Sequence, residues 1–195
     1  VREWMRENNT TTHILTSLDD IAWLFNIRGG DIKYNPVVLS YAVITLDKAI
    51  LFVDENKLND EIKTSFGEEV VEIKNYFEIY EFVKTINKEE IVLIDSNKIS
   101  YSILKNIPAG VKVVNGMNPS TKFKAQKNSV EIENTKKAHI RDGVAVTKFM
   151  YWLKNNIGKI EITELSAADK ITELRREQGK FIEESFGTIA GYASN

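Results

Sequence analysis

The sequence predicts an α/β fold. Short runs of β-branched and aromatic residues alternate with stretches whose apolar residues follow helical spacing, and this alternation of periods is typical of α/β domains. Ile91–Ile94 are four consecutive apolar residues between charged flanks, as expected of a strand buried on both faces. Tyr41–Thr45 and Ala49–Val53 are separated by only three residues, which predicts a hairpin.

The N-terminal stretch predicts a helix, a strand and a second helix in that order. Residues 1–11 are polar and favour a helix, and the run His13–Thr16 predicts the first strand. Ser17, with Asp20 three residues later and an apolar run from Ile21 to Phe25, predicts a short, capped and buried helix. Capping also accounts for the carboxylates of Asp19 and Asp20.

The elements that follow the hairpin alternate between helix and strand. We expect helices at Asn59–Phe66, Ile79–Ile86 and Ser96–Lys105, and strands at Val70–Ile73, Ile91–Ile94 and Val111–Val114.

The composition changes after Asn118-Pro119, where a mainly helical region begins. Asn128 with Glu131 predicts the start of a long helix, and Thr163 predicts the cap of a second helix that stops near Gly179. The first helix carries an apolar stripe expected to face a core: Val146, Phe149, Met150, Leu153 and Ile157. Phe181–Ala190 then has the pattern of a strand. We therefore expect two domains, residues 1–125 and 126–195.

The composition is that of an ordinary globular protein and implies no charged partner. The 195 residues carry a net charge of -2, and 43% of them are hydrophobic. The chain has no cysteine, which excludes disulfides and thiolate metal sites and suits a cytoplasmic protein. No apolar run approaches the roughly 20 residues that span a bilayer, so no membrane partner is expected. The chain begins with Val1, and we interpret it as a piece of a longer protein.

The polar loop between the second helix and Pro36 is the candidate functional site. Its candidate residues are Asn26, Arg28, Gly29, Gly30 and Asp31. Paired glycines can adopt positive φ angles and allow close approach of the backbone. A guanidinium group beside free backbone N–H groups suits a carboxylate or a phosphate. From the residues alone, a turn with a salt-bridged arginine is the favoured explanation of the loop.

Two other patterns do not predict a site. His13 lies in a predicted strand and His139 in a predicted helix, so the pattern favours a structural role for each rather than a shared metal site. The basic stretch from Lys122 to Arg141 is interrupted by Glu131 and Glu133 and has no interleaved aromatic residues that would stack on bases. No nucleic-acid partner is expected.

The stretch Ser17–Ala42 resembles the second domain of Xaa-Pro aminopeptidases of the three-domain type, whose sequences follow the pattern LDEIAWLxNLRGxDxxxNPVxxxYA. The matching residues are Leu18, Asp19, Ile21, Ala22, Trp23, Leu24, Asn26, Arg28, Gly29, Asp31, Asn35, Pro36, Val37, Tyr41 and Ala42. The resemblance continues at residues 127–128, 131–133 and 137–145, at Glu164 and residues 166–170, and at residues 185–186 and 188–189.

This resemblance implies a fold and an activity. It implies a creatinase-like α/β domain over residues 1–125, with a mixed sheet flanked by helices, followed by a truncated α+β pita-bread segment over residues 126–195. The parent would be a cytoplasmic, homodimeric metallopeptidase, a hydrolase that removes the N-terminal residue from peptides with proline at position two. Two divalent metal ions, usually manganese, would be held by two Asp, one His and two Glu, all downstream of this chain.

The resemblance also sets expectations for the chain itself. It implies no catalytic and no metal-binding residue within the 195 residues. The creatinase-like domain helps to wall the peptide-binding cleft of the family, so we expect the loop at residues 26–31 to face that cleft. With at most one strand of the curved pita-bread sheet present, we expect the C-terminal segment to expose apolar side chains and strand edges and to self-associate.

Two alternative functions remain open at this point. A non-catalytic peptide-binding or chaperone-type relative would have the same architecture without the metal ligands. Prolidases and creatinases resemble the closing segments of the chain but not the density of matches in Ser17–Ala42.

Overall fold

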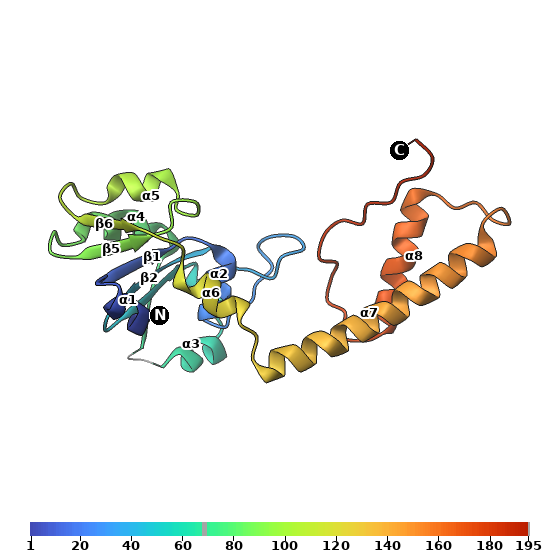
Figure 1. Cartoon of the computed structure of the whole chain (residues 1–195), viewed down its shortest axis with the longest axis horizontal. Coiled ribbons are helices and arrows are strands. Elements are labelled where there is room, and N and C mark those ends of the chain that lie inside the picture. The colour runs from blue at the N-terminus through green and yellow to red at the C-terminus, as the bar shows by residue number, and fades with distance from the viewer. Residues whose placement is uncertain (68–69, 195) are drawn as a thin grey trace. The chain divides into compact units, whose positions relative to one another are not determined.

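A computed structural model describes residues 1–67 and 70–194 of the chain. The chain divides into two compact units, Val1–Gln126 and Lys127–Asn195, and each unit is described by itself (Figure 1).

The first unit is a six-stranded sheet with helices on both faces. Its strands are β1 (Thr12–Leu15), β2 (Ser40–Thr45), β3 (Ala49–Val53), β4 (Val71–Lys74), β5 (Ile91–Ile94) and β6 (Lys112–Asn115). Its helices are α1 (Arg2–Glu7), α2 (Leu18–Leu24), α3 (Asp60–Phe66), α4 (Ile79–Phe82), α5 (Tyr101–Asn106) and α6 (Pro119–Ala125), with short 3-10 helices at Glu55–Lys57, Tyr76–Glu78 and Val83–Thr85.

The sheet is mixed, with the strand order β4-β3-β2-β1-β5-β6. β1, β2 and β3 pair antiparallel in sequence, and the hairpin of β2 and β3 is confirmed. β5 pairs parallel with β1, β6 with β5, and β4 with β3. The predicted mixed sheet flanked by helices is therefore confirmed.

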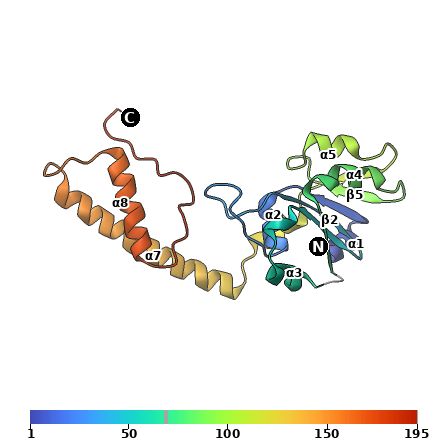
Figure 2. The ribbon, with the colours of Figure 1, turned by 180° about the vertical axis from the view of Figure 1, so that it is seen from behind.

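Two apolar cores lie on opposite faces of the sheet. Met5 of α1 and Ile21 of α2 pack with Leu15 of β1 on one face, while Ile79 of α4 and Ile103 of α5 pack with Ile14 on the other. Figures 1 and 2 show the same division, with α4 and α5 on one side of the sheet and α1, α2 and α3 on the other. Successive β1 residues enter different cores because side chains alternate along a strand.

Two helix predictions in this unit were inaccurate. The helix expected from Ser96 begins only at Tyr101, because the carbonyl of Asp95 accepts hydrogen bonds from the N–H groups of Lys98 and Ile99 and forms a turn first. The expected helix at Ile79–Ile86 is a short α-helix that continues as a 3-10 helix. α6 was not predicted, although Pro119 at its first position is a favoured helix start.

The second unit pairs a long helix, α7 (Ser129–Asn156), with a shorter one, α8 (Glu164–Glu177). The predicted caps are confirmed: Asn128 forms a capping box with Glu131, and the Thr163 side chain accepts a hydrogen bond from the N–H of Ser166. The core of this unit is small and contains Ala145, Ile171 and Leu174, with Val146 and Phe149 half-buried against it. The predicted stripe is only partly buried, since Met150 and Ile157 are exposed.

The strand expected at Phe181–Ala190 is not formed. The segment is irregular, and apart from Glu183 none of its backbone N–H or C=O groups has a hydrogen-bond partner among the residues described. A strand requires a neighbouring strand, and the described part of this unit contains none. In the same described residues no helix combines the length and the apolar character needed to cross a membrane.

Candidate functional site

The loop after α2 is held by Arg28. The Arg28 Nη1 atom donates hydrogen bonds to the carbonyl oxygens of Ala22, at 2.9 Å, and Ile27, at 2.8 Å. Ala22 lies in the last turn of α2, where a cation is favoured because the helix carbonyls point outward there. Arg28 thus closes the end of α2, while the side chain remains exposed to solvent.

The glycines of the loop are needed for a different reason than predicted. The prediction of positive φ angles was wrong: neither Gly29 nor Gly30 is in that region, whereas Asn26 is, at φ 52°. A Cβ atom on Gly29 would lie 3.0 Å from the Cβ atom of Val38, so the close approach of the chain to Val38 excludes a side chain. Gly30 faces open space.

Asp31 ties the loop to a neighbouring segment. Its carboxylate accepts a hydrogen bond from the Leu39 N–H at 2.7 Å and forms an ion pair with Lys57 at 2.7 Å. The hydrogen bonds from Lys57 and from the Leu39 backbone hold the pKa of Asp31 below its usual range. The orientation of this loop is therefore set by the Asp31–Lys57 ion pair at one end and by Arg28 at the other.

Four of the five candidate residues line one small pocket. The pocket has a volume of about 180 Å³ and is lined by Ile27, Arg28, Gly29, Gly30, Asp31, Val38, Lys57, Leu58 and Ile62. The fifth candidate, Asn26, is exposed and does not line it. Among the described residues, the backbone N–H groups of Arg28, Gly29 and Gly30 have no hydrogen-bond partner. The Arg28 side chain also forms no ion pair with a carboxylate of the described residues. These groups could bind a small anion.

A buried carboxylate that the sequence interpretation assigned to capping joins two helices. Asp20 is fully buried and accepts hydrogen bonds from Ser17 at 2.6 Å, Asn118 at 3.1 Å and Thr121 at 3.1 Å. Lys124 forms an ion pair with it at 3.2 Å. The capping prediction was wrong, because the Ser17 hydroxyl donates to Asp20 instead of accepting from the helix backbone. We call Asp20 and these four donors the Asp20 cluster.

The Asp20 cluster keeps its carboxylate ionised. Burial alone would raise the pKa of Asp20, but the hydrogen bonds from Ser17 and Asn118 and the charge of Lys124 lower it below its usual value. The cluster connects α2, which precedes the candidate loop, to α6, the last helix of the first unit.

The two histidines lie in different units. His13 is fully buried in β1, with Nδ1 3.1 Å from the carbonyl oxygen of Leu93, and its Nε2 atom has no partner in the described part of the chain. Burial lowers the pKa of His13 to about 4, so the ring is neutral at pH 7. His139 is exposed on α7. A structural role for His13 accounts for its position.

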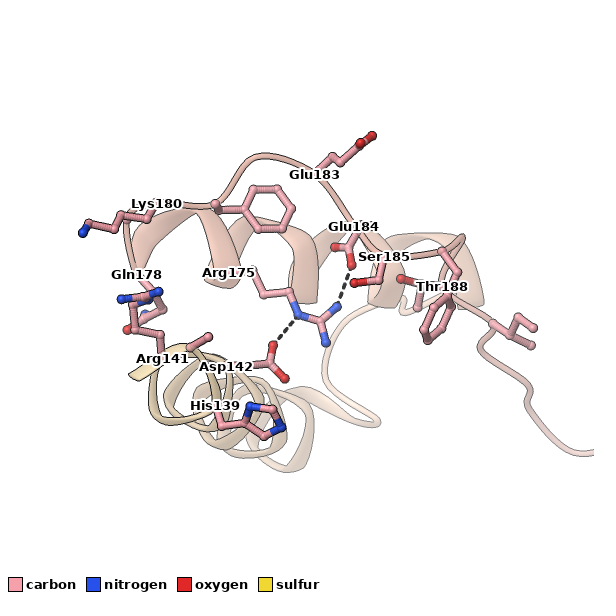
Figure 3. A pocket seen from close by; sticks show the side chains of 15 residues that line it. His139, Arg141, Asp142, Arg175, Gln178, Lys180, Glu183, Glu184, Ser185 and Thr188 are labelled. Atoms are coloured by element: carbon pink, nitrogen blue, oxygen red, sulfur yellow. Dashed lines mark hydrogen bonds and ion pairs between the residues drawn. The ribbon is translucent and has the colours of Figure 1, made fainter. Parts of the chain in front are cut away.

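A larger pocket lies in the second unit. It has a volume of about 590 Å³, and its lining includes Arg175, whose guanidinium lies between two carboxylates, as Figure 3 shows. Arg175 Nε is 2.8 Å from Asp142, and Nη1 is 2.8 Å from Glu184. Thr172 also donates a hydrogen bond to Glu184, at 2.6 Å. The bonds to Glu184 attach the irregular segment to α8, and the bond to Asp142 joins α8 to α7.

No metal centre is formed by the described side chains. Over residues 1–67 and 70–194, no group of three or more His, Cys, Asp or Glu side chains is placed to hold a metal ion.

The comparison with protein families decides the classification. Residues 1–131 match the model of the creatinase/prolidase N-terminal domain, which is more than half of the chain. The chain belongs to this family. The matched range contains both the candidate loop and the Asp20 cluster.

Relatives of this creatinase/prolidase family member carry one recurring name. A protein of Sordaria macrospora is 37% identical over the whole chain, and one of Neurospora crassa is 36% identical over the whole chain. Both are named "Probable Xaa-Pro aminopeptidase P". The chain spans 34% and 30% of their lengths, respectively, so about two thirds of each relative has no counterpart here.

Solved structures agree with the family assignment. The X-prolyl aminopeptidase of Caenorhabditis elegans, described as a cytosolic enzyme with a di-nuclear active site, matches with a TM-score of 0.89 and 30% identity. That match covers 95% of this chain and 31% of the other. The Xaa-Pro dipeptidase of Bacillus anthracis matches with a TM-score of 0.67 and 16% identity over 91% of this chain and 47% of the other, which shows a common fold.

Proposed function

We propose that the chain is part of a metal-dependent Xaa-Pro aminopeptidase, which removes the N-terminal residue from peptides with proline at position two. The observation that carries the proposal is the length of the match. The 37% identity to a named aminopeptidase P extends over all of the chain, beyond the 131 residues of the family model. The structural match to the C. elegans enzyme likewise covers 95% of the chain.

The metal ions of the proposed enzyme are bound outside this chain. The described residues do not fit a dinuclear centre, since they provide no cluster of metal-ligating side chains. We propose two divalent metal ions, with manganese as the first candidate. Two Asp, one His and two Glu of the remaining polypeptide would hold them. Such a pair of ions would activate a water molecule and polarise the scissile carbonyl group.

The two parts of the chain then have separate roles. Residues 1–125 would be the creatinase-like domain that walls the substrate cleft, and residues 126–195 would be the first part of the pita-bread domain. The helix pair α7 and α8, within the region matched by the C. elegans enzyme, supports the second assignment. We propose a cytoplasmic location, proline-containing peptides as substrates and a homodimeric parent.

The proposed activity requires the remaining polypeptide. The 195-residue chain with added Mn²⁺ is expected to release no amino acid from an Xaa-Pro-Pro peptide, because its residues 1–67 and 70–194 form no cluster of metal-ligating side chains. A polypeptide extended to the full length of the relatives should cleave the peptide and lose this activity with a chelator. Turnover by the 195-residue chain alone, or no turnover by the extended protein, would contradict the proposal. The second result would favour a non-catalytic peptide-binding relative.

Arg28 is expected to contribute to substrate binding in the extended enzyme. Arg28→Ala should lower kcat/KM by about tenfold or more, because a guanidinium at a cleft wall can pair with a carboxylate of the peptide. The loss of its hydrogen bonds to Ala22 and Ile27 should cost about 1 kcal/mol of stability.

The matched control removes another cation from the same loop region. Lys33 lies over the ring of Tyr34 and does not line the pocket, so Lys33→Ala changes the net charge equally but should leave kcat/KM unchanged. Steady-state kinetics and thermal unfolding of both variants separate the two roles. A large loss of stability in Arg28→Ala with unchanged kcat/KM would show that Arg28 serves the fold alone.

A further inference from the structure

A continuous set of bonds connects the Asp20 cluster to the candidate loop. Asn118, Thr121 and Lys124 follow one another at intervals of three residues, so they lie on one face of α6 and approach the same carboxylate. That carboxylate belongs to α2, a helix of only 7 residues, which make about two turns. The position of this short helix relative to α6 is therefore fixed at Asp20.

The carboxyl end of α2 continues this set of bonds to Arg28. Asn26 has a φ of 52°, and its N–H donates to the carbonyl oxygen of Trp23. The N–H of the next residue, Ile27, donates to the carbonyl oxygen of Ala22 at 3.0 Å. These are the two hydrogen bonds of a Schellman motif. Arg28 Nη1 donates to the same Ala22 oxygen at 2.9 Å, so the end of α2 holds the guanidinium.

The hydrogen bonds at Asp20 restrain α2 in a way that its apolar contacts do not. Ile21 and Ala22 are buried in the core, but apolar burial is non-directional. Hydrogen bonds are restricted in both length and angle. A helix rises about 1.5 Å per residue, so Ala22 lies only about 3 Å from Asp20 along the axis of α2. A shift of α2 at Asp20 would therefore move the oxygen that holds Arg28.

We propose that Asp20 is a positioning residue for substrate binding: through α2 it sets the place of the Arg28 guanidinium in the pocket of about 180 Å³. The proposal rests on the proposed function, because it takes a carboxylate of the peptide as the ligand of Arg28. Asp20 is fully buried and does not line this pocket. It acts on the substrate only through Arg28.

The first test measures the mobility of the Arg28 side chain in the 195-residue chain. Asp20→Asn keeps the shape of the side chain but removes its charge and one acceptor atom. The order parameter of the Arg28 Nε–H bond, from NMR relaxation, should fall by at least about 0.2, and the Ile27 N–H should exchange at least about tenfold faster. Thr121→Val removes a single donor to Asp20 and should change both quantities in the same direction. It decides the test if Asp20→Asn does not fold.

Two controls separate positioning from a loss of stability. Asp19→Asn removes the exposed partner of Lys124 and should leave the Arg28 order parameter unchanged. Ile103→Ala truncates a buried side chain of α5 on the opposite face of the sheet, so it destabilises the first unit without a change near α2. Arg28 should stay ordered in this variant. An order parameter that is unchanged in Asp20→Asn, or that falls equally in Ile103→Ala, would overturn the proposal.

The second test is a double-mutant cycle in the polypeptide extended to the full length of the relatives. Asp20→Asn should lower kcat/KM at least about threefold when Arg28 is present and not in the Arg28→Ala background, because its effect passes through Arg28. No loss in either background, or a loss of equal size in both, would overturn the proposal. An extended protein without turnover would contradict the proposed function instead, and the NMR measurement would still decide whether Asp20 positions Arg28.

Discussion

Replacing Asp20 by alanine is expected to lower the free energy of unfolding of the first unit by about 3 kcal/mol. The substitution leaves the side-chain donors of Asn118 and Ser17 buried without their acceptor, and it leaves Lys124 without its buried partner. Removing one member of a buried ion pair costs about 3 to 5 kcal/mol, and the lower end applies because the Lys124 side chain is 24% exposed.

Asp19 provides the matched control for this substitution. It precedes Asp20 and also pairs with Lys124, but its side chain is 53% exposed, so Asp19→Ala should cost less than about 1 kcal/mol. Urea unfolding followed through Trp4 and Trp23 gives the stability, and hydrogen exchange of α6 reports its attachment. Faster exchange in α6 should accompany Asp20→Ala. An equal loss of unfolding free energy in the two variants would show that the burial of Asp20 does not contribute to stability.

Acid is expected to weaken the first unit well above the pH at which carboxylates titrate. The pKa of His13 falls from 6.5 in the unfolded chain to about 4 in the folded unit, chiefly through burial, although Asp20 and Asp95 partly oppose the shift. Between these values the unfolded chain binds a proton that the folded chain does not. The free energy of unfolding therefore has its full value above pH 6.5 and decreases as the pH falls toward 4. At pH 5 this decrease amounts to about 2 kcal/mol.

The measurement is the urea midpoint of the first unit at pH 7.5 and at pH 5. His13→Asn, which has no titrating group but can still donate to Leu93, should remove most of the difference, although it lowers stability at both values. His139→Asn should retain the difference, because His139 is exposed and lies in the second unit. A pH dependence unchanged in His13→Asn would assign the acid sensitivity to other groups.

Local signals in the sequence were sufficient for most of the secondary structure. The caps at Asn128 and Thr163, the apolar run of β5 and the short connection between β2 and β3 each depend on neighbouring residues alone, and all of these elements are present. The errors occurred where a local pattern competed with another interaction. Because a turn forms at Asp95, α5 begins several residues later than its sequence pattern predicts. Residues Phe181–Ala190 have the pattern of a strand, but the described residues of this unit provide no strand to pair with them.

The candidate site was predictable only in part. Four loop residues do line a common pocket, but the structural need for Gly29 arises from Val38, nine residues away. The Asp20 cluster could not be found from the sequence, because Asn118 and Thr121 lie 98 and 101 residues from Asp20. Nothing near Asp20 distinguishes a buried carboxylate from an ordinary residue of the first helical turn.

The position of the Asp20 cluster also determines how the first unit responds to tension. α6 is its last helix, so a pull applied through Lys127 reaches the sheet through α6 before it reaches any strand. Lys124, Thr121 and Asn118 follow one another backward along this path, and each is bonded to the same carboxylate. Force would therefore load the bond of Lys124 first, then that of Thr121 and then that of Asn118. We expect α6 to detach from α2 in this order while the strands β1 to β6 remain paired.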